Sequence, residues 1–85
     1  MQVTYTRDAL KGLRRMPEAK RLDVIETMKR VAHDPSVRDN NIKPLKGIEN
    51  AFRRRFGDWR VSYIVDRAGN VIEVFEVAPR GGAYR

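Results

Sequence analysis

The first third of the chain combines a short alternating pattern with a helical one. Val3 and Tyr5 alternate with polar neighbours, which is typical of a short β-strand within residues 1–5. Thr6 is a suitable helix N-cap. The apolar residues that follow recur at three-residue spacing: Leu10, Leu13 and Met16. We therefore predict a short amphipathic helix, which Gly12 weakens by about 1 kcal/mol relative to alanine.

A longer amphipathic helix is predicted next. Pro17 suits the first position of a helix, and the pair Asp34-Pro35 ends it, because the residue before a proline avoids the α region. The apolar residues in between form one stripe: Leu22, Ile25, Met28 and Ala32, widened by Val24 and Val31. We expect this face to pack on a sheet, with Leu13, Leu22 and Ile25 buried.

The second half of the chain has the pattern of a sheet. Residues 36–50 contain few apolar positions and are predicted to form a loop. Three apolar segments follow, at 51–56, 59–66 and 71–78. Gly57-Asp58 and residues 68–70 separate these segments and have the residue types of tight turns, so we predict a three-stranded antiparallel meander.

These elements predict an α+β fold with the order β-α-α-β-β-β, in a single domain that spans residues 1–85. Both helices should pack on one face of a small, mostly antiparallel sheet, which makes two layers. The connection through both helices is long enough for the first strand to pair in parallel with a central strand.

Composition excludes several kinds of chemistry. The absence of cysteine excludes disulfides, thiolate catalysis and thiolate metal sites. The single histidine, His33, cannot build a histidine-rich metal site, so we expect neither a metal nor a cofactor. No apolar run approaches the ~18 residues of a membrane span, and no signal-peptide core is present. We therefore expect a cytoplasmic protein that does not enter membranes.

The chain is also strongly basic. It has 18 Lys and Arg against 11 Asp and Glu, which gives a net charge of +7. Such a charge favours a polyanionic partner, namely nucleic acid, the ribosome or an acidic protein. The alternative is a basic surface that only keeps the protein soluble.

The most informative segment is Phe52-Arg53-Arg54-Arg55-Phe56. In a strand, Phe52, Arg54 and Phe56 share one face, which the phenylalanines should turn toward the helices. Arg53 and Arg55 then stand on the open face, about 7 Å apart, a spacing that suits adjacent phosphates. Arg54 points toward the helix layer, so it must reach an edge or pair with an acid.

Further residues could join this arginine pair. Arg60 lies across the predicted turn from Arg55, while Arg80 and Tyr84 follow the last strand. Arginines bind phosphates in a bidentate manner and tyrosine stacks on bases, so the set could bind RNA; the alternative is a solvated basic face. Glu73 and Glu76 are three residues apart, which predicts opposite faces of a strand and makes them poor candidates for a concerted acid–base pair.

Three segments resemble the RelE/ParE superfamily of bacterial toxins from type II toxin–antitoxin systems. Residues 43–47 resemble its K-x-L-x-G loop, and residues 52–63 resemble its R-x-R-x-G-D-Y-R-x-x-Y core. Residues 77–84 are similar to its C-terminal V-x-H-R-x-x-x-Y signature. The order and spacing of the three segments are more specific than any one of them, and the resemblance implies the same β-α-α-β-β-β fold.

The resemblance implies one of two activities. RelE-like members cut mRNA in the ribosomal A site by attack of a ribose 2′-OH on the adjacent phosphate, whereas ParE-like members inhibit DNA gyrase without a nuclease site. The catalytic residues carried over from the RelE-like members are Arg53, Arg55, Arg60, Arg80 and Tyr84. Lys43 and Lys46, with Arg53 and Arg55, are the expected RNA-binding residues.

The resemblance also implies roles and partners. Arg55 and Arg60 would stabilise the phosphate, Arg53 would position it or the 2′-OH, Arg80 would assist the leaving 5′-oxygen and Tyr84 would orient a base. Pro79 replaces the family histidine, and arginine is no general base, so catalysis would depend on electrostatics. We expect a ribosome-dependent endoribonuclease, neutralised by an acidic antitoxin over the basic face. The alternatives are a gyrase inhibitor and an inactive nucleic-acid-binding module.

Overall fold

The computed structural model describes residues 1–79 of the chain. Its elements are β1 (Gln2–Tyr5), α1 (Arg7–Arg15), α2 (Glu18–His33), β2 (Ile42–Pro44), β3 (Ala51–Phe56), β4 (Trp59–Asp66) and β5 (Val71–Pro79). This arrangement confirms the predicted α+β class, both helices and the three C-terminal strands, of which only the last ends one residue later than expected.

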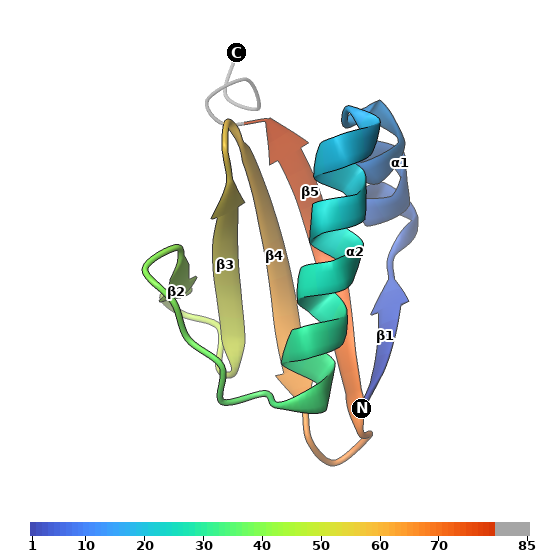
Figure 1. Cartoon of the computed structure of the whole chain (residues 1–85). Helices are drawn as coiled ribbons and strands as arrows, with labels where there is room; N and C mark the ends of the chain where they lie inside the picture. Colours follow the sequence, from blue (N-terminus) through green and yellow to red (C-terminus); the bar gives the residue numbers. More distant parts are fainter. Residues whose placement is uncertain (80–85) are drawn as a thin grey trace.

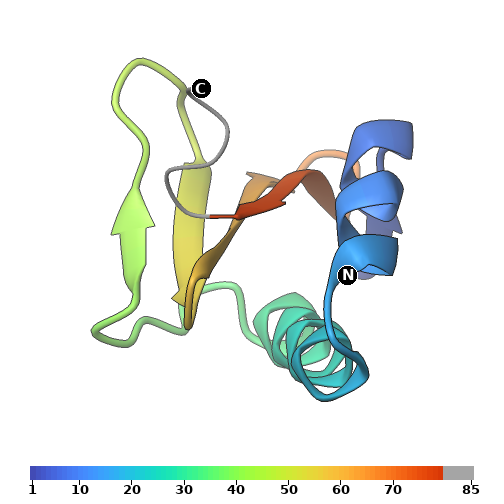
Figure 2. The ribbon, with the colours of Figure 1, turned by 90° about the horizontal axis from the view of Figure 1, so that it is seen from above.

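All strands belong to one sheet, with the order β1-β5-β4-β3-β2 (Figure 1). β1 pairs in parallel with β5, an interior strand, and every other pairing is antiparallel. The parallel pairing predicted for the first strand is therefore confirmed. Figure 2 shows α2 beneath the sheet and α1 against its β5 side, so the opposite face carries no helix formed by residues 1–79. We call that face the open face.

The predicted loop over residues 36–50 contains a strand that the sequence pattern did not indicate. β2 pairs with β3 and places Ile42 opposite Arg54, and Ile42 is buried. The strand has only three residues, of which Lys43 and Pro44 are exposed. A single apolar residue has no periodicity, and Pro44 argues against a strand except at an edge, which is the position that β2 occupies.

The core lies between the helices and the sheet. Its largest fully buried apolar side chains come from α2, β4 and β5: Val24, Met28, Val31, Val61, Tyr63, Ile72 and Val74. Leu13 is buried as predicted, but Ile25 is only partly buried and Leu22 is 59% exposed, so the prediction for Leu22 was wrong. The buried face of α2 includes the polar residue Thr27, which interrupts the apolar pattern of that face. The neighbouring stripe that contains Leu22 has no such interruption, so the sequence pattern favoured the wrong stripe.

Gly12 has a packing role in addition to its cost in helix propensity. The backbone of α1 approaches β5 so closely here that a methyl group on Gly12 would overlap the Val77 carbonyl oxygen and lie 2.9 Å from the Val77 Cβ. Only glycine allows this approach. Gly12 therefore lets α1 pack directly on β5, whose C-terminal end pairs with the start of β4.

Candidate functional site

The β3–β4 hairpin brings three arginines to the open face. Its turn contains Gly57, whose φ of +61° lies in the left-handed region that favours glycine. The resulting register pairs Arg55 with Arg60 and Arg53 with Ser62. Directly paired residues point to the same side of a sheet, so Arg53, Arg55 and Arg60 share the open face, as the alternation predicted.

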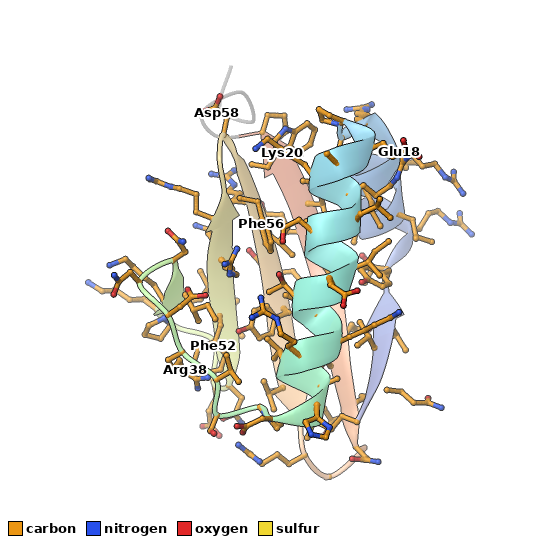
Figure 3. The ribbon with its side chains drawn as sticks, viewed as in Figure 1. Glu18, Lys20, Arg38, Phe52, Phe56 and Asp58 are labelled. Carbon is orange, nitrogen blue, oxygen red and sulfur yellow. The ribbon has the colours of Figure 1, made fainter. Side chains whose placement is uncertain are left out.

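The two phenylalanines of β3 lie on the opposite side. Phe56 is 4% exposed, and Phe52 is partly buried against the core. Figure 3 shows both on the side of the sheet that α2 covers, with Arg38 beside Phe52. The Arg38 guanidinium carbon lies 4.1 Å from the Phe52 ring centroid, so the segment after α2 is held over this part of the sheet by a cation–π contact.

Arg54 lies on the helix side of β3 and pairs with an acid, as the strand pattern predicted. Its guanidinium carbon lies 4.3 Å from the Phe56 ring centroid, and its Nη2 lies 3.1 Å from Asp39 Oδ2. Desolvation opposes the ionised form of Asp39, but the Asn41 backbone N–H and the Arg54 charge outweigh it and lower the pKa of this carboxyl. Arg54 therefore ties the loop before β2 to β3 and is not presented on the open face.

A cavity of about 490 Å³ opens beside the three arginines. Its lining residues come from β2, β3, β4 and the loops that flank β2: Asn40, Asn41, Lys43, Pro44, Leu45, Arg53, Arg55, Trp59 and Arg60. Among residues 1–79, the lining contributes four cationic side chains and no carboxylate. β2 contributes Lys43, which stands opposite Arg53 in the register. Such a cavity favours an anionic ligand large enough to contact several strands.

The three arginines differ in their surroundings. The Arg55 side chain is exposed and makes no hydrogen bond or ion pair within residues 1–79. The Arg53 side chain is 38% exposed; its Nε donates to Ser62 Oγ at 3.1 Å and its Nη2 to Glu76 Oε1 at 3.2 Å. The Arg60 side chain is 12% exposed, and its Nε lies 3.7 Å from Glu76 Oε2. Arg55 is thus the most accessible of the three to a ligand.

Glu76 is a residue of this site that sequence reasoning missed. The register pairs Ser62 with Glu76 but Tyr63 with Val74, so Phe75 is an extra residue in a β-bulge of β5. Glu73 pairs with Ile64, two residues from Ser62, and therefore Glu73 and Glu76 point to the same face. The expectation of opposite faces was wrong, because a bulge shifts the alternation by one residue and no local sequence signal marks this one.

Lys46 does not line this cavity. Lys46 lines a neighbouring hollow of about 560 Å³, which shares Leu45 and Arg53 with the first. Arg80 and Tyr84 lie outside the described residues. β5 is described as far as Pro79, which pairs with the cavity-lining residue Trp59.

Two further properties concern the part of the chain that the structure describes. Residues 1–79 contain no group of three or more acidic or histidine side chains that could hold a metal ion. Neither helix within these residues combines the length and the hydropathy of a membrane span.

Comparison with known proteins identifies the family. No family model matches the chain. RelE1 of Methanocaldococcus jannaschii, a toxin by its curated name, is 34% identical over 80 residues, which cover 89% of this chain and 86% of the relative. This identity and coverage confirm the resemblance stated above and place it on the RelE side of the superfamily.

Solved structures agree with this assignment. The match to the archaeal RelE–RelB complex from Pyrococcus horikoshii OT3 has a TM-score of 0.79 at 27% identity and covers 95% of this chain and 96% of that one. The match to the intact RelBE toxin–antitoxin complex from E. coli has a TM-score of 0.77 at 20% identity, over 92% and 94% of the two chains, and shows the shared fold. The chain belongs to the RelE family of toxins from toxin–antitoxin systems.

Proposed function

We propose that this protein is a ribosome-dependent mRNA endoribonuclease that inhibits translation by cutting the message. The observation that carries the proposal is the cavity on the open face, where Lys43, Arg53, Arg55 and Arg60 converge from three strands. Membership of the RelE family supports the same reaction. A phosphodiester backbone suits these cations, since each guanidinium can form two parallel hydrogen bonds to phosphate oxygens.

The reaction would proceed within the RNA chain. The ribose 2′-oxygen would form a new bond to the adjacent phosphorus, and the bond from phosphorus to the 5′-oxygen would break. The 2′-OH would lose its proton and the leaving 5′-oxygen would gain one. The 5′ fragment would then end in a cyclic phosphate, and the 3′ fragment would begin with a free hydroxyl.

The arginines would act on the charge that develops during this step. Arg55 and Arg60, paired across the hairpin, would stabilise the phosphorane, and Arg53 would position the phosphate or the 2′-OH. One preorganised donor of this kind contributes roughly 3–4 kcal/mol to the transition state. Arg80 would assist the leaving oxygen, and Tyr84 would orient a base. The ribosome would hold the message so that the 2′-oxygen lies in line with the scissile bond.

The same basic face would bind the antitoxin. The related chains of known structure occur in complexes named RelE–RelB and RelBE toxin–antitoxin. An acidic antitoxin segment over Lys43, Lys46 and the arginines would cover the cavity and exclude RNA. The protein would act in the cytoplasm, where the ribosomes and the message are.

The direct test is primer extension on a message translated by purified ribosomes. The protein should produce new 5′ ends at positions within the coding region, and the same message without ribosomes should remain uncut. The reaction should stop when the cognate antitoxin is added. If the message stays intact while the protein inhibits supercoiling by DNA gyrase, the nuclease proposal is wrong and gyrase inhibition takes its place.

A further inference from the structure

Glu76 connects two of the arginines on the open face. Its Oε1 accepts a hydrogen bond from Arg53 Nη2 at 3.2 Å, and its Oε2 lies 3.7 Å from Arg60 Nε. One carboxylate therefore contacts both side chains. The third arginine of the cavity, Arg55, has no such contact within residues 1–79.

A buried serine fixes the carboxylate. Ser62 is 0% exposed, and its hydroxyl donates to Glu76 Oε1 at 2.7 Å while it accepts from Arg53 Nε at 3.1 Å. Ser62, Glu76 and Arg53 thus form a closed set of three hydrogen bonds. Two guanidinium nitrogens of Arg53 are held, which restricts a side chain that otherwise rotates about several bonds. Its Nη1 has no partner among the described residues and remains available to a ligand.

The charges of Arg53, Arg60 and Glu76 are compatible with binding of a phosphate. Arg53 and Arg60 repel each other, and one carboxylate between them offsets that repulsion. Two positive charges and one negative charge leave a net positive charge that still attracts a phosphate. The bulge at Phe75 makes the arrangement possible. In a strand with regular alternation, Glu76 would share the face of Val74 and point toward the helices.

We infer that Glu76 is a positioning residue, which holds the Arg53 and Arg60 guanidinium groups toward the phosphodiester without contacting the RNA itself. The identity of the ligand rests on the proposed function. The ordering of the two arginines does not, since it follows from the contacts of Glu76 in the protein alone. An arginine already held in place loses less freedom when the transition state forms.

Two measurements on four proteins test this inference. The proteins are the wild type, Glu76→Ala, the nearly isosteric Glu76→Gln and the control Glu73→Gln. Glu73 lies on the same strand and the same face, so its substitution changes the net charge equally. The first measurement is the NMR signal of the Arg53 Nε–H group, assigned by its absence in Arg53→Lys. The second is single-turnover cleavage of ribosome-bound message, with the binding constant measured separately.

The expected pattern separates position from charge. Glu76→Ala should move the Arg53 Nε–H signal to the position of a freely rotating arginine, and it should slow cleavage roughly 10- to 100-fold. Binding should be unchanged or tighter, because a negative charge has been removed. Glu76→Gln should lie between Glu76→Ala and wild type in both measurements. Glu73→Gln should resemble wild type in the signal and in the rate.

Other outcomes overturn one claim or the other. An Arg53 signal that is the same in wild type and in Glu76→Ala refutes the positioning role, as does wild-type cleavage by both Glu76 variants. Equal slowing by Glu73→Gln would mean that only net charge matters. If the wild-type protein does not cut any ribosome-bound message, the proposed function fails, and the NMR comparison still decides whether Glu76 orders the arginines.

Discussion

Arg55 and Arg60 stand directly opposite each other across the β3–β4 hairpin, although both carry a positive charge. Like charges at paired positions destabilise a sheet by roughly 0.2–1 kcal/mol. The cost is partly offset on one side only, since Arg60 forms an ion pair with Glu76 whereas Arg55 forms no ion pair within residues 1–79. The unfavourable pairing agrees with the proposed function, in which an anionic phosphate would bind between the two side chains.

Replacing Arg55 with alanine should separate catalysis from stability. The side chain is exposed and makes no internal hydrogen bond or ion pair within residues 1–79, so the unfolding midpoint should not fall. Cleavage of ribosome-bound message should fall roughly 100- to 1,000-fold, the range for loss of one charge-stabilising donor. Arg67→Ala is the control, because Arg67 is an exposed arginine in the β4–β5 turn, at the other end of β4. Equal cleavage by both variants would remove Arg55 from the site.

Arg60→Ala and Arg80→Ala should each lower the rate of the chemical step by a similar factor. Ribosome binding should weaken much less, because many other cations share that task. Tyr84→Phe should have a mild effect if the ring stacks on a base and a severe effect if the hydroxyl orients a phosphate or ribose. Primer extension and ribosome co-sedimentation measure the two quantities. Cleavage that survives both arginine substitutions together would place the active site elsewhere.

The buried face of α2 predicts a contrast between two large apolar residues of the same helix. Met28 is 0% exposed, so Met28→Ala should cost about 2–5 kcal/mol of unfolding free energy. Leu22 is 59% exposed, so Leu22→Ala should change the unfolding free energy by less than about 0.5 kcal/mol. Urea denaturation measures both. A large loss for Leu22→Ala would show that this side of α2 is covered in solution.

Gly12→Ala should destabilise the protein even though alanine favours helices. The gain in propensity is about 1 kcal/mol. The added methyl group would overlap the Val77 carbonyl, and forced overpacking of this kind costs roughly 1–3 kcal/mol, so a net loss is expected if the backbones cannot separate. Lys11→Ala, at the exposed neighbouring position, should be nearly neutral. A higher melting temperature for Gly12→Ala would mean that α1 moves away from β5 at little cost.

The association rate with the antitoxin should fall as salt is added. The part of the cavity lining that the structure describes carries four cations and no carboxylate, so attraction to an acidic segment steers the encounter at low ionic strength. Stopped-flow fluorescence between about 0.05 and 0.5 M salt covers the range in which screening becomes strong. A rate that does not change with salt would place the antitoxin on an uncharged surface.

Local patterns in the sequence determined most of the fold. The alternation in residues 52–56 assigned the phenylalanines to the helix side and Arg53 and Arg55 to the other, because a strand offers only two faces. The turn residues at Gly57-Asp58 predicted the hairpin that pairs Arg55 with Arg60. These features depend on interactions between near neighbours in the chain, so they can be read without knowledge of the rest.

Only the tertiary structure decided the features that depend on distant segments. β2 exists because the edge of β3 supplies its hydrogen-bond partners, and β2 in turn brings Lys43 to the cavity. The shape of the sheet surface determines which face of α2 is buried. That face contains Val24 and Met28 but not Leu22. The bulge that turns Glu76 toward Arg53 and Arg60 arises from the pairing of β4 with β5. Each of these depends on contacts between residues far apart in the sequence, and periodicity within one segment carries no information about them.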